Sequence, residues 1–159
     1  MPGSGKTTLA KQVAEEMNLS FVDLDQEIEN QEQKSIPEIF NQQGEDYFRQ
    51  VESSLLKQWA SSSKSFVMAT GGGAPCFFKG IDVINNSGIT VFLDVPLPEL
   101  IARVAKKQGR PLLQTDDNNE LEKKLKTMRD KRVWFYQQAH ITLTEPSAMK
   151  LLKALQFKK

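Results

Sequence analysis

The stretch Met1-Pro-Gly-Ser-Gly-Lys-Thr-Thr8 opens the chain and decides how the rest of the sequence is interpreted. Phosphate-binding loops follow the pattern G-x-x-x-x-G-K-S/T, and Gly5, Lys6 and Thr7 occupy its last three positions. The first glycine of the pattern would stand one residue before Met1. Apolar residues then recur at helical spacing over residues 6–17, which favours a loop-to-helix junction over a flexible Gly/Ser-rich terminus.

The chemistry of a phosphate-binding loop requires these residue types. Small residues let the backbone N–H groups of a turn converge on phosphate oxygens, and the N-terminus of the following helix adds a partial positive charge. The lysine reaches the outer phosphates of a nucleotide, and the hydroxyl after it suits Mg²⁺. We therefore expect the nucleotide contacts to come from Gly3, Ser4, Gly5, Lys6, Thr7 and Thr8.

Composition and charge restrict the class of protein. The chain has 159 residues, of which 39% are hydrophobic and 26% charged, as expected of one globular domain over 1–159. The formal net charge of +1 argues against a nucleic-acid partner, and no apolar run approaches the roughly 18 residues of a membrane span. One cysteine, Cys76, excludes an internal disulfide and fits a reducing compartment. With no signal or transit peptide in view, we expect a cytoplasmic enzyme.

Periodicity and turn residues predict alternating helices and strands. The strands are predicted at residues 20–25, 65–70, 89–94 and 140–144. The helices are predicted at residues 6–17, 35–43, 45–60, 77–86, 98–106, 120–139 and 146–157. A polar loop over 107–119 is long enough to be a lid. With a further strand before the phosphate-binding loop, this order predicts a largely parallel, three-layer α/β/α domain.

Two carboxylates follow the first of these strands. Asp23 and Asp25 are two residues apart, so they would project to the same side of an extended chain. At the carboxyl end of a strand that follows a phosphate-binding helix, they are well placed for Mg²⁺ and a substrate hydroxyl. The alternative is that one carboxylate caps a helix and the other faces solvent.

Two further groups are candidates for a site. Gly71-Gly-Gly73 directly follows an apolar strand, where it would expose backbone N–H groups and allow a ligand to approach closely. A flexible turn is the alternative. Arg49 and Glu52 are three residues apart on a predicted helix and therefore neighbours, and a surface ion pair is the simplest interpretation.

Together these segments resemble the shikimate kinases, within the nucleoside-monophosphate-kinase-like P-loop proteins. The resemblance covers essentially the whole chain. It rests on Gly3-Ser-Gly-Lys-Thr-Thr8, Asp23-Leu-Asp25, Ser35-Ile-Pro-Glu-Ile-Phe40, Gly44-Glu-x-x-Phe-Arg-x-x-Glu52, Thr70-Gly-Gly-Gly73, Arg110-Pro-Leu-Leu113 and Lys131-Arg132 with Tyr136. Each segment alone is weak or typical only of the superfamily, whereas their joint order and spacing are specific.

The resemblance implies transfer of the γ-phosphoryl group of ATP to the 3-hydroxyl of shikimate, in the biosynthesis of chorismate and aromatic amino acids. It implies that Lys6 holds the ATP phosphates, that Thr7 binds Mg²⁺ and that Asp23 supports the metal through water. It implies that Asp25 binds the substrate hydroxyls and is the candidate base. Lys6, Asp25 and Arg110 are thus the expected catalytic residues.

The resemblance also places the acceptor. Arg49 and Arg132 would clamp the carboxylate of shikimate, and Glu52 would orient Arg49. The glycines expected to line that site are Gly71, Gly72 and Gly73. The substrate-binding helices would span about 26–60.

Three features implied by the resemblance surround the nucleotide. Arg110 would reach the phosphate from the lid at 107–119. Arg103 would flank the adenine, together with the loop near Pro146.

The sheet order implied by the resemblance is 2-3-1-4-5, and strand 1 precedes the phosphate-binding loop. This central strand is absent from the sequence, so a gap is expected between the strands near Phe66 and Val91. We expect the natural chain to have about ten further residues upstream, the length of a strand with its flanks. The sequence as it stands predicts poor stability and little kinase activity.

Two alternatives to shikimate phosphorylation remain at this stage. One is another small-molecule P-loop kinase, such as a gluconate-type kinase, which Arg49 with Arg132 and the Arg110-Pro-Leu-Leu113 lid disfavour. The other is a nucleotide-binding protein with impaired catalysis, favoured only by the incomplete loop. A monomer without a nucleic-acid or membrane partner is expected in each case.

Overall fold

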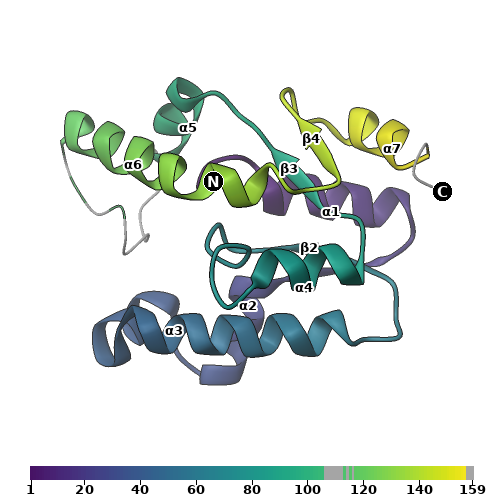
Figure 1. The fold of residues 1–159 in the computed structure, drawn as a ribbon, viewed down its shortest axis with the longest axis horizontal. Helices are drawn as coiled ribbons and strands as arrows, with labels where there is room; N and C mark the ends of the chain where they lie inside the picture. Colours follow the sequence, from purple (N-terminus) through teal and green to yellow (C-terminus); the bar gives the residue numbers. More distant parts are fainter. Residues whose placement is uncertain (106–112, 114, 116, 157–159) are drawn as a thin grey trace.

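The computed structural model of the chain describes residues 1–105, 113, 115 and 117–156 (Figure 1). Its helices are α1 (Lys6–Glu16), α2 (Leu24–Glu32), α3 (Ile36–Ala60), α4 (Gly80–Ser87), α5 (Leu97–Val104), α6 (Asn118–Tyr136) and α7 (Ala148–Gln156). Its strands are β1 (Ser20–Asp23), β2 (Phe66–Ala69), β3 (Val91–Leu93) and β4 (Ile141–Leu143). Helices and strands thus alternate as predicted, with two differences. The periodicity did not predict α2, and the helices predicted at 35–43 and 45–60 form the single helix α3.

The strands form two separate parallel pairs. β1 pairs with β2, with Ser20 opposite Phe66, and β3 pairs with β4, with Val91 opposite Ile141. Over the described ranges, no strand joins β2 to β3. The sheet is therefore divided at the place where the order 2-3-1-4-5 puts its central strand, as predicted.

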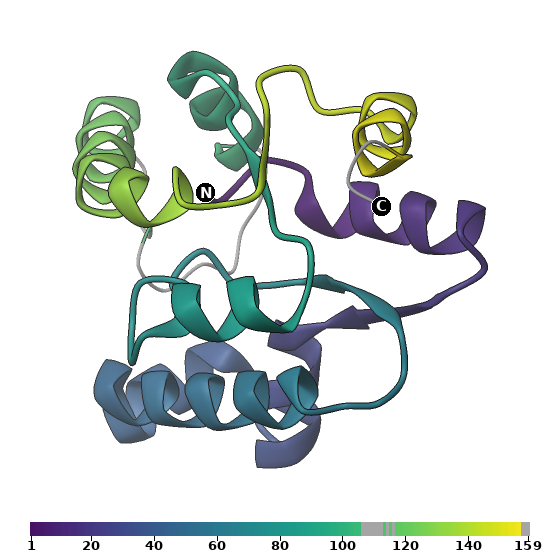
Figure 2. The same ribbon diagram turned by 45° about the vertical axis from the view of Figure 1, so that its right-hand side comes forward.

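Helices cover both faces of the divided sheet (Figures 1 and 2). α1 packs on β1 and β2 and against α7, whereas α4 packs against α3, which in turn contacts α2. Side chains alternate along β2 accordingly, because Val67 packs with the cluster around α1 and α7 while Met68 packs with the cluster around α2 and α3. This is the predicted α/β/α arrangement of three layers.

The core consists of three apolar clusters. One lies around α2 and α3, where Leu24, Ile28 and Ile39 are fully buried. A second joins α1, α7 and the β3–β4 pair, and a third joins α5 and α6 to Met1. Met1 is only 4% exposed, so the first residue is a part of the core.

The boundaries of α3 follow from its sequence. Ser35 caps the helix in a capping box, in which the Glu38 carboxylate accepts from the Ser35 N–H at 2.8 Å. The break predicted at Gly44 is a kink, with φ 81° and ψ 173°, inside a helix that continues to Ala60. Glycine suits this position because its φ lies in the left-handed range.

The end of β1 differs from the prediction. The strand stops at Asp23, which caps α2 by accepting a hydrogen bond from the Asp25 N–H at 3.1 Å. Asp25 therefore belongs to the first turn of α2, and the argument that both carboxylates project from one extended chain is wrong. The physical reason is that an aspartate satisfies a free N–H at a helix start, which favours a helix directly after the strand.

The predicted lid is only partly described. Residues 106–112, 114 and 116, including Arg110, lie outside the described residues. α6 begins at Asn118 and is capped by the Asp117 side chain. The loop predicted over 107–119 therefore ends at Asp117, before residue 119.

None of the helices in the described part of the chain combines the length and the apolar character that crossing a membrane requires.

Candidate active site

The phosphate-binding loop precedes α1 and has a left-handed backbone at two glycines. Gly3 has φ 77° and Gly5 has φ 86°. A Cβ on Gly3 would lie 2.9 Å from Cγ2 of Val104, so the loop can pack against α5 only with glycine there. In the described part of the chain, no side chain caps the N-terminus of α1. Its first N–H groups and its positive dipole end are therefore directed toward the loop, as an anion site requires.

Side chains of the loop converge on the Met1 carbonyl. The buried Ser4 hydroxyl donates to it at 2.9 Å, and Lys6 Nζ donates to it at 2.8 Å. These contacts hold the lysine over the loop that it would serve in a nucleotide complex.

Thr7 and Asp23 form an oxygen pair beside the loop. The Thr7 hydroxyl donates to Asp23 Oδ2 at 3.1 Å. Mg²⁺ prefers oxygen ligands and is usually held by one or two carboxylates together with substrate phosphates. Among the residues that the structure describes, no group of three or more His, Cys, Asp or Glu side chains could hold a metal. Mg²⁺ therefore fits Thr7 and Asp23 if phosphate oxygens complete its ligands.

Arg49 is enclosed by acidic and aromatic side chains. It is 5% exposed, and its Nη1 donates at 2.7 Å to Glu52, which is 1% exposed. Glu45 accepts from its Nε and Nη2 at 3.1 and 3.0 Å. The rings of Phe48 and Phe77 lie 5.0 and 4.6 Å from its guanidinium carbon. The interpretation as a surface ion pair is therefore wrong, because this guanidinium is buried and held from several sides.

Glu52 also faces Asp25 across a glycine. A Cβ on Gly71 would lie 2.7 Å from Glu52 Oε1 and 2.9 Å from Asp25 Oδ1. Burial raises the pKa of the Glu52 carboxyl above its ordinary value of 4.5, against the opposing effect of Arg49. Glu52 Oε1 is buried and has no hydrogen-bond partner among the residues that the structure describes. A buried acceptor in this state is suited to a donor from a bound molecule.

The next two glycines approach other charged side chains. A Cβ on Gly73 would lie 2.2 Å from Arg49 Nη1 and 2.5 Å from its Cζ. A Cβ on Gly72 would lie 3.3 Å from Arg132 Nη1 and equally far from the Tyr136 hydroxyl. The backbone after β2 thus approaches these groups more closely than a side chain would allow, which favours a binding platform over a flexible turn.

Tyr136 fastens α6 to this platform. Its hydroxyl donates to the Gly72 carbonyl at 2.6 Å, and its ring packs on Phe92 at a centroid distance of 5.2 Å. Burial raises the pKa of Tyr136 to about 12, so the hydroxyl stays a donor at neutral pH. Arg132 lies one turn earlier on α6 and is held beside Gly72 in this way.

One cavity of about 610 Å³ brings most of the predicted residues together. Those that line it are Thr7, Asp23, Asp25, Arg49, Glu52, Gly71, Gly72, Gly73 and Arg132. Apolar walls come from α3 and α6, through Ile36, Pro37, Phe40, Phe48 and Met128. The cavity thus combines positive and negative groups with an apolar rim, at the carboxyl ends of β1 and β2.

Other predicted residues lie elsewhere. Arg103 Nη1 donates to the Gly3 carbonyl at 3.2 Å, so this side chain lies against the phosphate-binding loop. Thr8 is exposed on α1, and Pro146 lies in the connection between β4 and α7. Ser4 and Lys6 line an adjoining cavity between β2 and β3.

Sequence reasoning missed two of the groups around Arg49. Glu45 could have been found, because it stands four residues before Arg49 on the same helix face. Phe77 gives no such signal, because only the tertiary fold brings it to Arg49. Cys76 is a free, partly buried thiol, and burial raises its pKa to about 11, which keeps it protonated at neutral pH.

Comparison with known proteins shows the family of the chain. A family model described as shikimate kinase matches residues 2–156. The chain belongs to the shikimate kinase family. A shikimate kinase of Bacteroides fragilis is 42% identical over 139 residues, covering 87% of this chain and 77% of that protein. A shikimate kinase of Clostridium botulinum is 40% identical over 160 residues, covering 97% and 91% of the two chains.

Solved structures of shikimate kinases share the fold. The shikimate kinase of Acinetobacter baumannii, solved in complex with shikimate, matches with a TM-score of 0.90 at 34% identity, over 99% of this chain and 90% of that one. The shikimate kinase of Bacteroides thetaiotaomicron matches with a TM-score of 0.88 at 34% identity, over 97% and 93%. The predicted P-loop kinase fold and the predicted family are thereby confirmed.

Proposed function

We propose that this member of the shikimate kinase family transfers the γ-phosphoryl group of ATP to the 3-hydroxyl of shikimate. The observation that carries the proposal is a single cavity that joins a phosphate-binding edge to a carboxylate-binding edge. Thr7 and Asp23 lie at the phosphate-binding edge, and Arg49 and Arg132 lie at the carboxylate-binding edge. A small acid with hydroxyl groups fits between them. No observation favours a gluconate-type kinase or a protein that only binds nucleotide.

The acceptor would be bound through its carboxylate and its hydroxyls. Two guanidinium groups suit a carboxylate, because charge-assisted hydrogen bonds are shorter and stronger than neutral ones. Arg49 is already held in place by Glu45 and Glu52. Binding of the acceptor therefore does not cost the conformational entropy of ordering this side chain. Asp25 and Glu52 Oε1 face the same point beside Gly71, where the substrate hydroxyls would donate.

The donor would be bound by the loop from Gly3 to Thr8. Its N–H groups and Lys6 are proposed to hold the ATP phosphates, while Thr7 and Asp23 hold Mg²⁺. Mg²⁺, when bound, neutralises charge on the phosphate oxygens. Phosphoryl transfer is catalysed mainly by positioning and charge neutralisation, which are the contributions this set of residues can make.

Asp25 is the proposed proton acceptor. Its carboxylate would hydrogen-bond the 3-hydroxyl, orient its oxygen toward the phosphoryl group and take its proton as the new bond forms. Arg110 in the lid, Arg103 near the adenine and the loop at Pro146 stay predictions. A monomer in the cytoplasm is proposed from the sequence alone.

A coupled assay of ADP release tests the function. ADP should form from ATP and Mg²⁺ when shikimate is added, and the product should be shikimate 3-phosphate by mass spectrometry. Gluconate and the nucleoside monophosphates are the control acceptors. ADP release that is equal with and without shikimate, or faster with gluconate, would contradict the proposal.

Replacing Arg132 with alanine should weaken the binding of shikimate far more than the binding of ATP. We expect KM for shikimate to rise about 10- to 100-fold, because a hydrogen bond to a charged group is lost, with little change in KM for ATP. Lys131→Ala is the matched control, because Lys131 is exposed on the same helix. Equal effects on both substrates in steady-state kinetics would argue against the carboxylate role.

Replacing Gly73 with alanine should displace Arg49. The added Cβ would overlap the guanidinium, so we expect kcat/KM for shikimate to fall about 100-fold. Gly88→Ala is the control, because a Cβ there meets none of the described residues within 4 Å and its φ of −178° is ordinary extended backbone. A Gly73→Ala protein with unchanged kinetics would show that this close approach does not position the clamp.

A further inference from the structure

The turn between β2 and α4 places the ring of Phe77 against Arg49. The ring centroid of Phe77 lies 4.6 Å from the guanidinium carbon of Arg49, and that of Phe48, on the same helix as Arg49, lies 5.0 Å away. A cation within about 6 Å of an aromatic ring face is attracted by the quadrupole of the ring, more strongly where water is excluded. Arg49 is buried, so the attraction between its charge and the Phe77 ring is weakly screened.

The backbone directly after Phe77 has a conformation that side-chain-bearing residues rarely adopt. Phe78 has φ 48° and Lys79 has φ 58°, so both are left-handed. Residues in this conformation persist where the surrounding structure holds them, and they cluster at ligand sites. The turn is therefore held in one conformation next to the residue that meets Arg49.

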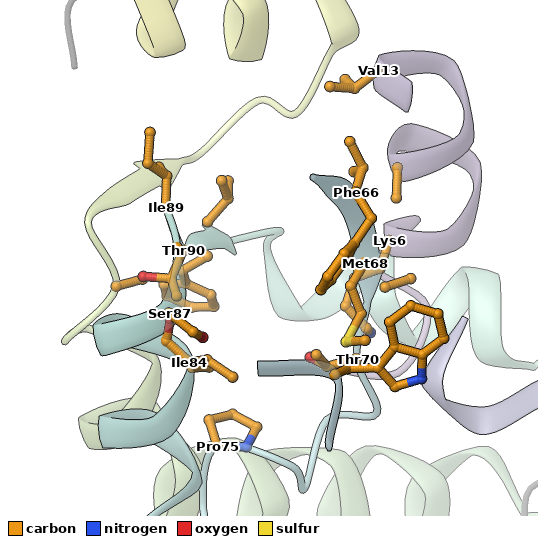
Figure 3. Close-up of a pocket in the computed structure, with 18 of the residues that line it drawn as sticks. Lys6, Val13, Phe66, Met68, Thr70, Pro75, Ile84, Ser87, Ile89 and Thr90 are labelled. Atoms are coloured by element: carbon orange, nitrogen blue, oxygen red, sulfur yellow. The ribbon is translucent and has the colours of Figure 1, made fainter. Parts of the chain in front are cut away.

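Contacts within the turn show what holds it. The Gly80 N–H donates to the Phe77 carbonyl at 2.8 Å, and the Ile81 N–H donates to the Pro75 carbonyl at 3.0 Å. A Cβ on Gly80 would lie 1.8 Å from the Ala74 carbonyl oxygen, so the start of α4 packs directly on the turn. Pro75 also borders the adjoining cavity of about 560 Å³ between β2 and β3 (Figure 3). Phe77 is thus carried by a firmly packed turn.

The side chains around Arg49 leave part of its guanidinium for a ligand. An arginine has five N–H groups. In the described part of the chain, Nε and Nη2 donate to Glu45, and Nη1 donates to Glu52. One N–H group on each of Nη1 and Nη2 then remains for a bound carboxylate. These two groups serve a carboxylate only while the planar guanidinium keeps its orientation, which a ring packed against it restricts.

We propose that Phe77 is a positioning residue for the acceptor and holds the Arg49 guanidinium in the orientation that binds the acceptor carboxylate. Phe77 acts through Arg49, since Arg49 lines the cavity of about 610 Å³ and Phe77 is not among the described residues that do so. The inference rests on the proposed function, because it takes the acid bound at Arg49 to be shikimate.

Replacing Phe77 with leucine tests the proposal, because leucine is apolar and lacks the ring. We expect KM for shikimate to rise about 2- to 30-fold, the range between an exposed and a desolvated cation–π pair, with KM for ATP nearly unchanged. Phe77→Tyr keeps the ring and should keep KM near that of the unmodified chain. Phe78→Leu is the matched control, because it removes a ring from the next residue, which is 53% exposed.

Fluorinated phenylalanines at position 77 separate the electrostatic effect from the shape of the ring. Ring fluorines withdraw electron density and weaken the negative potential of the ring face, with little change in size. If the ring holds Arg49 by its quadrupole, KM for shikimate should rise stepwise as one, two and three fluorines are introduced. A ring that only fills space would give no such trend, and the absence of a trend overturns the proposal.

A further measurement does not require the acceptor. Hydrogen exchange of the Arg49 Nε–H, followed by NMR in the ligand-free chain, should be about fivefold or more faster in Phe77→Leu and unchanged in Phe77→Tyr and Phe78→Leu. An exchange rate that Phe77→Leu leaves unchanged overturns the proposal, and so do equal effects of Phe77→Leu and Phe78→Leu. ADP release that does not respond to shikimate contradicts the proposed function instead, and the exchange rate then decides alone whether Phe77 holds Arg49.

Discussion

Replacing Asp25 with asparagine is expected to lower kcat for shikimate phosphorylation by about 10²- to 10⁴-fold, the usual contribution of a positioned proton acceptor. Asparagine has nearly the same shape and can still hydrogen-bond a hydroxyl, but it cannot take its proton. Asp25 Oδ1 lies beside the Gly71 platform, opposite Glu52, so the change is made where the acceptor hydroxyl would lie. The affinity for nucleotide should be unchanged.

The measurement is a steady-state assay that varies shikimate and ATP separately, with direct binding of ATP as a second readout. Asp46→Asn is the control, because Asp46 is exposed on α3 and does not line the cavity. Turnover within a few-fold of the unmodified chain would remove Asp25 from the proton-transfer role.

Replacing Arg49 with methionine is expected to lower the free energy of unfolding by about 3–5 kcal/mol at neutral pH. The reason is that Glu52, which is 1% exposed, then keeps a buried charge without its 2.7 Å partner. The double variant Arg49→Met with Glu52→Gln should regain much of this stability, because an amide costs less to bury than a carboxylate. Neither protein should bind shikimate well, since the proposed clamp is missing from both.

The loss of stability caused by Arg49→Met should depend on pH in a defined direction. Burial raises the pKa of Glu52 above 4.5, and Arg49 opposes this shift, so removing Arg49 should raise the pKa further. A carboxyl whose pKa is higher in the folded chain than in the unfolded chain binds its proton more tightly when folded. It therefore disfavours folding at high pH, and the deficit of the variant should shrink as the pH falls toward 4.5.

Denaturant unfolding at several pH values measures both the loss of stability and its pH dependence. It is carried out on the unmodified chain, on Arg49→Met and on Arg49→Met with Glu52→Gln. Lys57→Met is the control, because Lys57 is an exposed cation on the same helix. A deficit that is constant from pH 5 to pH 8, or that the second substitution fails to reduce, would show that an unpaired Glu52 charge is not its cause.

Local patterns were sufficient for most of the fold. The loop glycines and the helical spacing over residues 6–17 each act within a few neighbouring residues, and each was predicted correctly. At Gly44 the position of the break was predicted, but as the end of a helix rather than as a kink within one. The division of the sheet was predicted from the implied strand order, and the two separate strand pairs confirm it.

Local reasoning failed where two local structures compete for the same residues. Asp23-Leu-Asp25 suits both a strand end and a helix start, and the hydrogen bond from the Asp25 N–H to Asp23 decides for the helix. Arg49 with Glu52 suits both a surface pair and a buried one. Whether Arg49 and Glu52 are buried depends on which elements cover α3, and this cannot be predicted from the spacing of residues along the helix.

The chain's own sequence determined that Met1-Pro-Gly-Ser-Gly-Lys-Thr-Thr8 is a phosphate-binding loop, because this depends on backbone geometry over a few residues. Only the tertiary structure decided that Gly71, Gly72 and Gly73 meet Asp25, Arg132 and Arg49 in one cavity. It also decided that Phe77 stacks on Arg49 and that Tyr136 ties α6 to Gly72. These contacts join residues that are far apart in the chain, and the packing of the layers, rather than the sequence between them, sets their distances.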